Sequence, residues 1–324
     1  MKAPVTSRRL IATGCLALVL SSCAAGRATA PDSSQATTGA RASTTTVEAP
    51  TTTTTPTASA PSPPYALSEL TLRLVDRSRP TVAAGRTISA TRALTTLVWM
   101  PVGAGRWPLI VFAHGFDVSP APYAALLGSW AAHGYVVAAP EFPLTDPDVA
   151  GSNLDEVDID NEVADLRFVT DYLVSPDSPL LDRIDPNRVA VAGHSDGAEA
   201  AIAAAAASVP AGEPRYLALL ALAAQPVEGT AGQNPPILVA QGDADTTNPP
   251  SYGLQTWQQA APPKYLLEIK GGGHLPPFEA GSVWLPGIES ITETFLDSYL
   301  AGDAGTASIT TTAGRYNGLY LRTG

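Results

Sequence analysis

The sequence predicts an α/β domain with a mostly parallel central sheet and helices on both of its faces. Short apolar runs alternate along the chain with segments of helical periodicity. This alternation favours a parallel sheet, because parallel neighbours need a crossover connection that is usually a helix. Several runs are continuously apolar, which is typical of strands that are buried on both faces.

Eight strands and four helices follow from this pattern. We expect strands at residues 70–75, 93–99, 109–113, 135–139, 188–192, 217–223, 237–240 and 265–269. We expect helices at residues 123–132, 160–174, 197–207 and 288–300. In the second helix Val163, Leu166 and Val169 recur at the helical period, and acidic residues occupy its first turn.

The N-terminus has the composition of an export signal. Three basic residues precede an apolar run at 10–20 that is too short to span a bilayer as a helix. The sequence Leu-Ser-Ser-Cys at 20–23 resembles a bacterial lipobox, and the two adjacent arginines resemble a weak twin-arginine signal. We therefore expect a signal peptide at 1–22 and a lipid on Cys23, which would anchor the exported protein to the outer face of the cytoplasmic membrane. A cleaved signal with an incidental cysteine is the alternative.

Cysteine content and charge narrow the function classes. Both cysteines, Cys15 and Cys23, lie in the N-terminal segment, so the remaining chain has no thiol for a disulfide, a metal or a nucleophile. The formal net charge is −11. An acidic surface argues against a nucleic-acid partner and against electrostatic attachment to anionic lipid.

Composition divides the rest of the chain into three parts. Residues 23–64 are rich in Thr, Ser, Pro and Ala and lack large apolar side chains apart from a single Val, which predicts a disordered linker. Residues 65–303 carry the strands and helices of the predicted domain. Residues 304–324 form a tail without clear periodicity, which either docks on the domain or stays loose. The side chains available for docking are Tyr316, Leu319 and Tyr320.

A G-x-S-x-G pattern carries the chemistry. Gly193, Ser195 and Gly197 follow an apolar strand and precede an Ala-rich helix. This is the setting of a nucleophile elbow, in which glycines leave room for a sharp turn and the serine hydroxyl stands at a helix N-terminus. The alternative is an ordinary strand-to-helix turn with a serine cap.

A serine hydroxyl needs a base, and four histidines are available. His194 is adjacent to Ser195 and has the wrong geometry, His133 suits a helix C-terminus, and His114 follows a strand and supports its loop. His274 lies in a glycine-rich loop between the last strand and the last helix, which leaves it as the expected base.

The remaining polar groups are an acid and two oxyanion donors. The loop at 242–249 carries two aspartates, Asp243 and Asp245, either of which would orient a base. The backbone N–H of Asp196 and that of Phe116 are the expected oxyanion donors. The carboxylate of Asp196 is tolerable there only if it points away or is paired.

An acidic stretch at 155–162 raises the question of calcium. It lacks EF-hand spacing and the EF-hand glycine, so acids at a helix N-terminus on a solvated face explain it more simply. We expect neither a metal nor an organic cofactor.

Three segments resemble bacterial α/β-hydrolases related to cutinase-like polyester hydrolases, chlorophyllases and platelet-activating-factor acetylhydrolases. They are Leu97–Pro101, Pro108–Phe116 and Gly134–Pro140, and the likeness extends over about residues 70–300. The resemblance implies the α/β-hydrolase fold and hydrolysis of carboxylic esters.

The resemblance also implies the catalytic residues. The order Ser, Asp, His along the chain is that of α/β-hydrolases. The acid of similar enzymes is the Asp of a Gly-x-x-Asp pattern, which selects Asp245 over Asp243 and leaves the latter to shape the loop by bonding backbone amides. Ser195, Asp245 and His274 are then the triad.

The connection that carries a helical cap in many relatives is short here. Residues 224–236 cannot hold a cap domain, so we expect an open, shallow site. The expected substrate-binding rim consists of Phe116, Gln225, Pro226, Leu275 and Phe278.

These expectations describe a serine hydrolase that cleaves small-molecule, lipid or polymeric esters through an acyl-enzyme. The alternatives are an acyltransferase or peptidase with the same triad, and a non-catalytic envelope lipoprotein that uses the groove for binding. The sequence does not indicate an oligomeric state.

Overall fold

The structure is a computed structural model that describes residues 63–207, 215–301 and 306–324. The predicted signal peptide, the lipidation site at Cys23 and nearly all of the predicted linker lie outside these residues. Within the described ranges, no helix combines the length and the apolar composition that crossing a bilayer requires.

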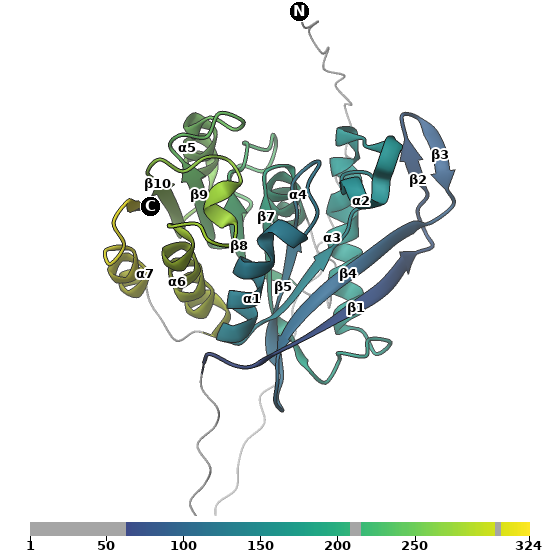
Figure 1. Cartoon of the computed structure of the whole chain (residues 1–324), viewed down its shortest axis with the longest axis horizontal. Coiled ribbons are helices and arrows are strands. Elements are labelled where there is room, and N and C mark those ends of the chain that lie inside the picture. The colour runs from purple at the N-terminus through teal and green to yellow at the C-terminus, as the bar shows by residue number, and fades with distance from the viewer. Residues whose placement is uncertain (1–62, 208–214, 302–305) are drawn as a thin grey trace, which may run out of the picture. The chain divides into compact units, whose positions relative to one another are not determined.

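A central sheet of nine strands runs through the described part of the chain (Figure 1). Its order is β1-β4-β6-β5-β7-β8-β9-β10-β11. The strands are β1 (Leu67–Asp76), β4 (Arg92–Pro101), β5 (Trp107–Ala113), β6 (Val136–Pro140), β7 (Ile184–His194), β8 (Tyr216–Leu222), β9 (Ile237–Gly242), β10 (Lys264–Ile269) and β11 (Leu319–Thr323). The strands from β6 to β10 in this order are parallel, and β1, β4 and β11 join antiparallel.

Helices cover both faces of the sheet, as the alternating pattern predicts (Figure 1). One face packs against α1 (Ala124–His133), α6 (Leu285–Leu296) and α7 (Thr306–Ala313). The other packs against α3 (Ile159–Val174), α4 (Asp196–Ala206) and α5 (Pro250–Gln259). The short elements are the β2–β3 hairpin (Thr81–Ala83, Arg86–Ser89), α2 (Pro147–Ala150), the 3₁₀ turns Ala121–Tyr123, Gly151–Asn153, Glu156–Asp158 and Pro276–Phe278, and a π turn at Asp297–Ala301.

Strand β5 shows why a continuous apolar run suits this sheet. Ile110 and Phe112 pack in the core on the side of α1, whereas Leu109 and Val111 pack in the core on the side of α3. All four side chains are fully buried. Because successive side chains of a strand point to opposite faces, a strand covered on both faces must be apolar at every position.

The C-terminal segment docks on the domain, which is one of the two alternatives that the sequence left open. Helix α7 buries Ile309, and β11 pairs antiparallel with β10 as an edge strand of the sheet. Leu319 is buried, whereas Tyr320 is largely exposed. The expected domain end at residue 303 is therefore too early, because a strand at a sheet edge needs no helical or alternating signal of its own.

The pattern also missed helix α5 and the β2–β3 hairpin. The helix begins with Pro250 and contains Gly253, whose missing side chain leaves room for Gln241. Only Gly253 and Thr256 are buried in this helix, so its sequence lacks the apolar stripe that indicates an amphipathic helix.

Candidate active site

Ser195 lies at a strained turn between β7 and α4. Its backbone φ is +55°, in a region that residues other than glycine rarely adopt. A Cβ at Gly193 would collide with the backbone of Gly197, and a Cβ at Gly197 would collide with the carbonyl oxygens of Ala113 and His114. The expectation that both glycines are required by the tight turn is confirmed.

The loops after β9 and β10 bring Asp245 and His274 to this turn. His274 Nε2 lies 2.9 Å from Ser195 Oγ, and His274 Nδ1 lies 2.8 Å from Asp245 Oδ2. Because the aspartate oxygen only accepts, Nδ1 carries the proton and Nε2 is left to accept from the serine hydroxyl. The imidazole side chain is 19% exposed, so the group is accessible from one side.

The carboxylate of Asp245 is held from several directions. Its Oδ1 accepts the N–H groups of Thr247 and Asn248, both at 2.9 Å, and its Oδ2 accepts from Gln241 Nε2 at 3.1 Å. These bonds leave one Oδ2 direction for His274. Asp243 plays the loop-shaping part expected of it, since its Oδ1 accepts the N–H of Gly271 at 2.5 Å.

His194 supports the loop of His274 and does not reach the serine. Its Nε2 donates to the backbone carbonyl of His274 at 3.0 Å, and its Nδ1 accepts from the hydroxyl of Tyr123 at 2.8 Å. Burial, with a further contribution from nearby His274, lowers the pKa of His194 to about 3. The ring is therefore neutral at physiological pH.

The two other histidines also have structural partners. His114 Nδ1 donates to the carbonyl of Gly115 at 2.9 Å, and its Nε2 accepts the N–H of Phe142 at 3.1 Å, so it supports the loop after β5 as expected. Burial lowers its pKa to about 4. His133 closes α1 and pairs with Asp297 of the π turn at 2.9 Å.

The expected oxyanion donors belong to two segments, the first residue of α4 and the loop after β5. Gly115 approaches the serine closely enough that a Cβ there would lie 3.3 Å from Ser195 Cβ. Within the described residues, neither the N–H of Phe116 nor that of Asp196 is engaged by a protein acceptor. Burial raises the pKa of the Asp196 carboxyl, Glu156 raises it further, and His274 opposes the shift.

Four of the five expected rim residues are at least partly accessible. Phe116, Gln225, Pro226 and Leu275 are half-buried. Gln225 Nε2 donates to Glu199 Oε1 at 2.8 Å, which directs its amide toward α4. The connection between β8 and β9 has neither helix nor strand, in agreement with the expected lack of a cap at this position.

Phe278 is the exception, and its assignment to the rim is wrong. Its side chain is fully buried and its ring meets that of His194 edge-on, with centroids 5.4 Å apart. The 3₁₀ turn at Pro276–Phe278 directs this ring into the core beneath the loop of His274. An aromatic residue four positions after the base therefore packs the loop from below.

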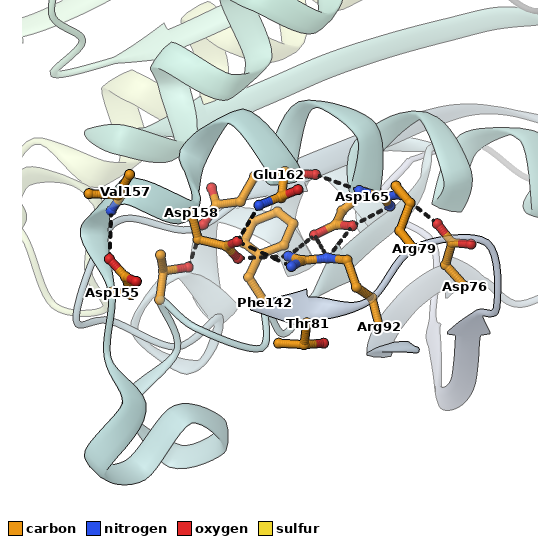
Figure 2. Close-up of polar contacts among 12 residues, drawn as sticks. Asp76, Arg79, Thr81, Arg92, Phe142, Asp155, Val157, Asp158, Glu162 and Asp165 are labelled. Carbon is orange, nitrogen blue, oxygen red and sulfur yellow. Dashed lines mark hydrogen bonds and ion pairs between the residues drawn. The ribbon is translucent and has the colours of Figure 1, made fainter. Parts of the chain in front are cut away.

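The acidic stretch at 155–162 forms only in part the solvated face that we expected, since Glu156 and Asp160 are exposed. Asp158 and Glu162 are buried, and Asp158 forms an ion pair with the fully buried Arg92 of β4 at 2.7 Å (Figure 2). Asp165 pairs with the same guanidinium at 2.5 Å. Because Arg92 and Asp158 are 66 residues apart, the local sequence gives no sign that they pair. The part of the chain described here holds no group of three or more His, Cys, Asp or Glu side chains arranged to bind a metal ion.

The comparison with known proteins agrees with the fold. Residues 76–250, just over half of the chain, match the chlorophyllase family, and this range includes Ser195 and Asp245. Chlorophyllase type 0 of Chenopodium album is 30% identical over 115 residues, which are 34% of this chain and 31% of that protein. The chain thus aligns with about a third of the length of this curated relative. The family is of the α/β-hydrolase type. The chain belongs to the chlorophyllase family.

Proposed function

We propose that this protein is a serine hydrolase that cleaves carboxylic esters through an acyl-enzyme. Ser195 is the nucleophile, His274 the general base and Asp245 the acid that orients it. The observation that carries the proposal is the chain of hydrogen bonds from Ser195 Oγ to His274 Nε2 and from His274 Nδ1 to Asp245 Oδ2, at 2.9 and 2.8 Å. Membership in an ester-hydrolase family supports the choice of ester over amide.

The chemistry follows from these positions. Ser195 Oγ attacks the ester carbonyl carbon while its proton passes to His274 Nε2. The N–H groups of Phe116 and Asp196 stabilise the negative charge that forms on the carbonyl oxygen. Collapse of the tetrahedral intermediate breaks the bond to the alkoxy group, which leaves as an alcohol with the proton from His274.

A water molecule completes the cycle. His274 removes a proton from the water as it attacks the acyl carbon, and Asp245 stabilises the imidazolium formed. The second intermediate releases the carboxylic acid and returns the proton to Ser195. The half-buried rim formed by Phe116, Pro226 and Leu275 is apolar, which favours small-molecule, lipid or polymeric esters with an apolar acyl group.

Ester turnover tests the proposal. We expect the wild type to hydrolyse p-nitrophenyl esters of increasing acyl length and Ser195→Ala not to. A fluorophosphonate should add one adduct to Ser195 in the mass spectrum. Adduct formation without ester turnover would favour the acyltransferase or peptidase alternative. A folded wild type that neither turns over esters nor reacts with the probe would favour the binding lipoprotein.

We also propose that the chain is exported and anchored through a lipid on Cys23. The support is the resemblance of 20–23 to a lipobox. In a bacterial host the wild type is expected in the membrane fraction with a diacylglyceryl mass on its N-terminal cysteine. Cys23→Ala should lose both the lipid and the membrane location. An unmodified, released wild type would contradict the anchor while leaving the hydrolase proposal intact.

A further inference from the structure

A buried acid, Glu162, lies outside the triad and is linked through Thr145 to the loop after β5 that carries Phe116. Its side chain on α3 is fully buried. Oε1 accepts from the hydroxyl of Thr145 at 2.5 Å, whereas Oε2 has no partner among the described residues. A carboxyl group without a cationic partner is costly to bury, so its presence at this position calls for a physical reason.

Thr145 links this acid to the loop beside the nucleophile. The carbonyl oxygen of Thr145 accepts the N–H of Asp117 at 2.9 Å. Asp117 follows Phe116 directly and has a φ of +57°, a conformation that persists only where the surroundings hold it. Because the peptide plane of Asp117 is fixed by Thr145, the direction of the preceding Phe116 amide depends on where Thr145 lies.

The helix that carries Glu162 is itself fixed to the sheet. Figure 2 shows the guanidinium of Arg92 between Asp158 and Asp165, one turn before and one turn after Glu162 on the chain. Arg79 donates to the same Asp165 carboxylate at 2.5 Å. Arg92 of β4 and Arg79 of the turn after β1 therefore hold the start of α3, the helix that carries Glu162.

The surroundings of Glu162 favour its neutral form. Burial raises the pKa of this carboxyl, the bond from Thr145 opposes the shift, and the charges of Asp165, Asp158 and Asp196 add to it, so that the pKa is about 8. Arg92 is already paired with Asp158, directly before α3, and with Asp165 of α3. A neutral carboxyl needs no counter-ion, which reconciles its complete burial with its single partner.

On the basis of the hydrolase function proposed above, we propose that Glu162 and Thr145 are positioning residues for the oxyanion hole. Glu162 holds the Thr145 hydroxyl, and Thr145 holds the Asp117 amide, so that the N–H of Phe116 stays directed at the site where the substrate oxygen becomes negative. Neither residue contacts the substrate. Their contribution is confined to the transition state, in which that N–H is needed most.

Substitution of Thr145 tests the link. Thr145→Val keeps the shape and removes the hydroxyl, and we expect kcat to fall about tenfold to a hundredfold with little change in KM, as for a displaced catalytic group. Thr145→Ser keeps the hydroxyl and should recover most of the loss. Thr170→Val is the matched control, because Thr170 is an equally buried threonine of α3 whose hydroxyl donates to Leu166 O away from the site. Its kcat should stay near that of the wild type.

Substitution of Glu162 tests the other end of the same link. Glu162→Gln retains an acceptor for the Thr145 hydroxyl without charge and should keep near wild-type kcat at neutral pH. Glu162→Leu removes the acceptor and should lower kcat as Thr145→Val does. The double variant Glu162→Leu/Thr145→Val should be no worse than either single one, because both break one chain of contacts.

Amide hydrogen exchange separates this proposal from the proposed function. In Thr145→Val the peptide that covers 114–118 should exchange at least tenfold faster than in the wild type, whereas Thr170→Val should leave it unchanged. This result is expected whether or not the protein hydrolyses esters, so absent turnover in the wild type would overturn only the proposed function. Unchanged exchange at 114–118 together with unchanged kcat in folded Thr145→Val would overturn the positioning role.

Discussion

The two sides of Ser195 are built from different kinds of contact. On the base side, Asp245 and His274 come from the loops after two adjacent parallel strands, β9 and β10, and meet at the same edge of the sheet. On the side of the proposed oxyanion hole, which we call the oxyanion side, Asp117 of the loop after β5 hydrogen-bonds to Thr145, and Thr145 hydrogen-bonds to Glu162 of α3. The start of α3 is in turn held by the guanidinium of Arg92 from β4. The first side is an arrangement of neighbours, and the second is a chain of contacts between distant segments.

Each side includes one buried histidine, and the two use opposite tautomers. His194 carries its proton on Nε2 and donates it to the carbonyl of His274, while its Nδ1 accepts from Tyr123. His114 carries its proton on Nδ1 for the carbonyl of Gly115, while its Nε2 accepts from Phe142. Burial keeps both rings neutral, so the partners decide the tautomer. Each ring therefore donates from one nitrogen and accepts at the other, and the two rings use these nitrogens in opposite ways.

The comparison separates activity from stability. The base side depends on a few hydrogen bonds around a partly exposed imidazole, so changes there should affect kcat far more than folding. The oxyanion side depends on buried charges, and removal of one partner from a buried pair is expensive. Changes there should affect folding first and kcat through the position of the loop.

The largest expected effect lies on the base side. Asp245→Asn should lower kcat about 10⁴-fold, which is typical of an Asp→Asn change in a Ser–His–Asp triad, because the amide favours the wrong tautomer of His274. Asp243→Asn keeps an oxygen that accepts from Gly271 N–H and should stay within about threefold of the wild type. Steady-state kinetics with a p-nitrophenyl ester measure both, and a reversed ranking would assign the acid to Asp243.

The next effect lies in the buried pair behind the oxyanion side. Arg92→Leu leaves the carboxylate of Asp158 buried without a cation and that of Asp165 with Arg79 alone, and we expect a loss of about 3–5 kcal/mol in the free energy of unfolding. Arg322→Leu removes a half-exposed pair with Glu268 and should cost at most about 1 kcal/mol. Urea denaturation compares the two variants. Equal losses would contradict the distinction between buried and exposed pairs.

A smaller, pH-dependent effect is expected at Glu162. Its pKa is raised in the folded protein from 4.5 to about 8, so the folded state holds a proton that the unfolded state releases above about pH 4.5. The contribution of Glu162 to the free energy of unfolding is therefore fully present below about pH 4.5 and is lost progressively as the pH rises to about 8. The groups facing it are Asp158 directly before α3, Asp165 of α3, Asp196 of α4, and Thr145.

The side chain of Glu162→Gln cannot ionise, so the stability of this variant relative to the wild type should grow as the pH rises from 4.5 to about 8. We expect the melting temperatures of the two proteins to differ least at pH 4.5 and the variant to melt several degrees higher at pH 8.5. Differential scanning calorimetry across the interval measures the difference. A gap between the two proteins that stays constant with pH would show that Glu162 titrates normally.

The smallest expected effect compares the two buried histidines. His194→Phe removes the bond to the His274 carbonyl and should lower kcat about tenfold while shifting the pH at which activity appears, because the base is held differently. His114→Phe loosens Phe142 and should lower kcat by a similar factor without that shift. The pH profile of kcat distinguishes them. Identical pH profiles for both variants would contradict the distinction between the base side and the oxyanion side of Ser195.

The base side was largely predictable from the sequence. Ser195 stands between a strand and a helix, and His274 and the Asp243/Asp245 pair follow apolar strands. The carboxyl ends of parallel strands share one edge, so residues just after them are brought together whatever the distance along the chain. Resemblance to known hydrolases then selected Asp245, and the structure brings that residue into contact with His274.

The oxyanion side was only partly predictable. Phe116 and Asp196 follow from chemistry, but nothing near 155–162 announces that Asp158 pairs with Arg92 or that Glu162 is buried. A run of acids has the same local composition on a solvated face as beside a buried guanidinium. Phe278 was misjudged for a similar reason, since an apolar residue in a polar loop fits a rim or a core equally well.

By itself, the sequence determined the α/β class, the elbow at Ser195 and the order of the reactive side chains, because hydrophobic period and turn chemistry act over a few residues. Tertiary structure alone decided the partners of Arg92, the tautomers of His114 and His194, and the docking of the C-terminal segment through α7 and the edge strand β11. Each of these depends on which distant groups share a buried space. Desolvation, which makes an unpartnered polar group costly, acts only after the chain has folded.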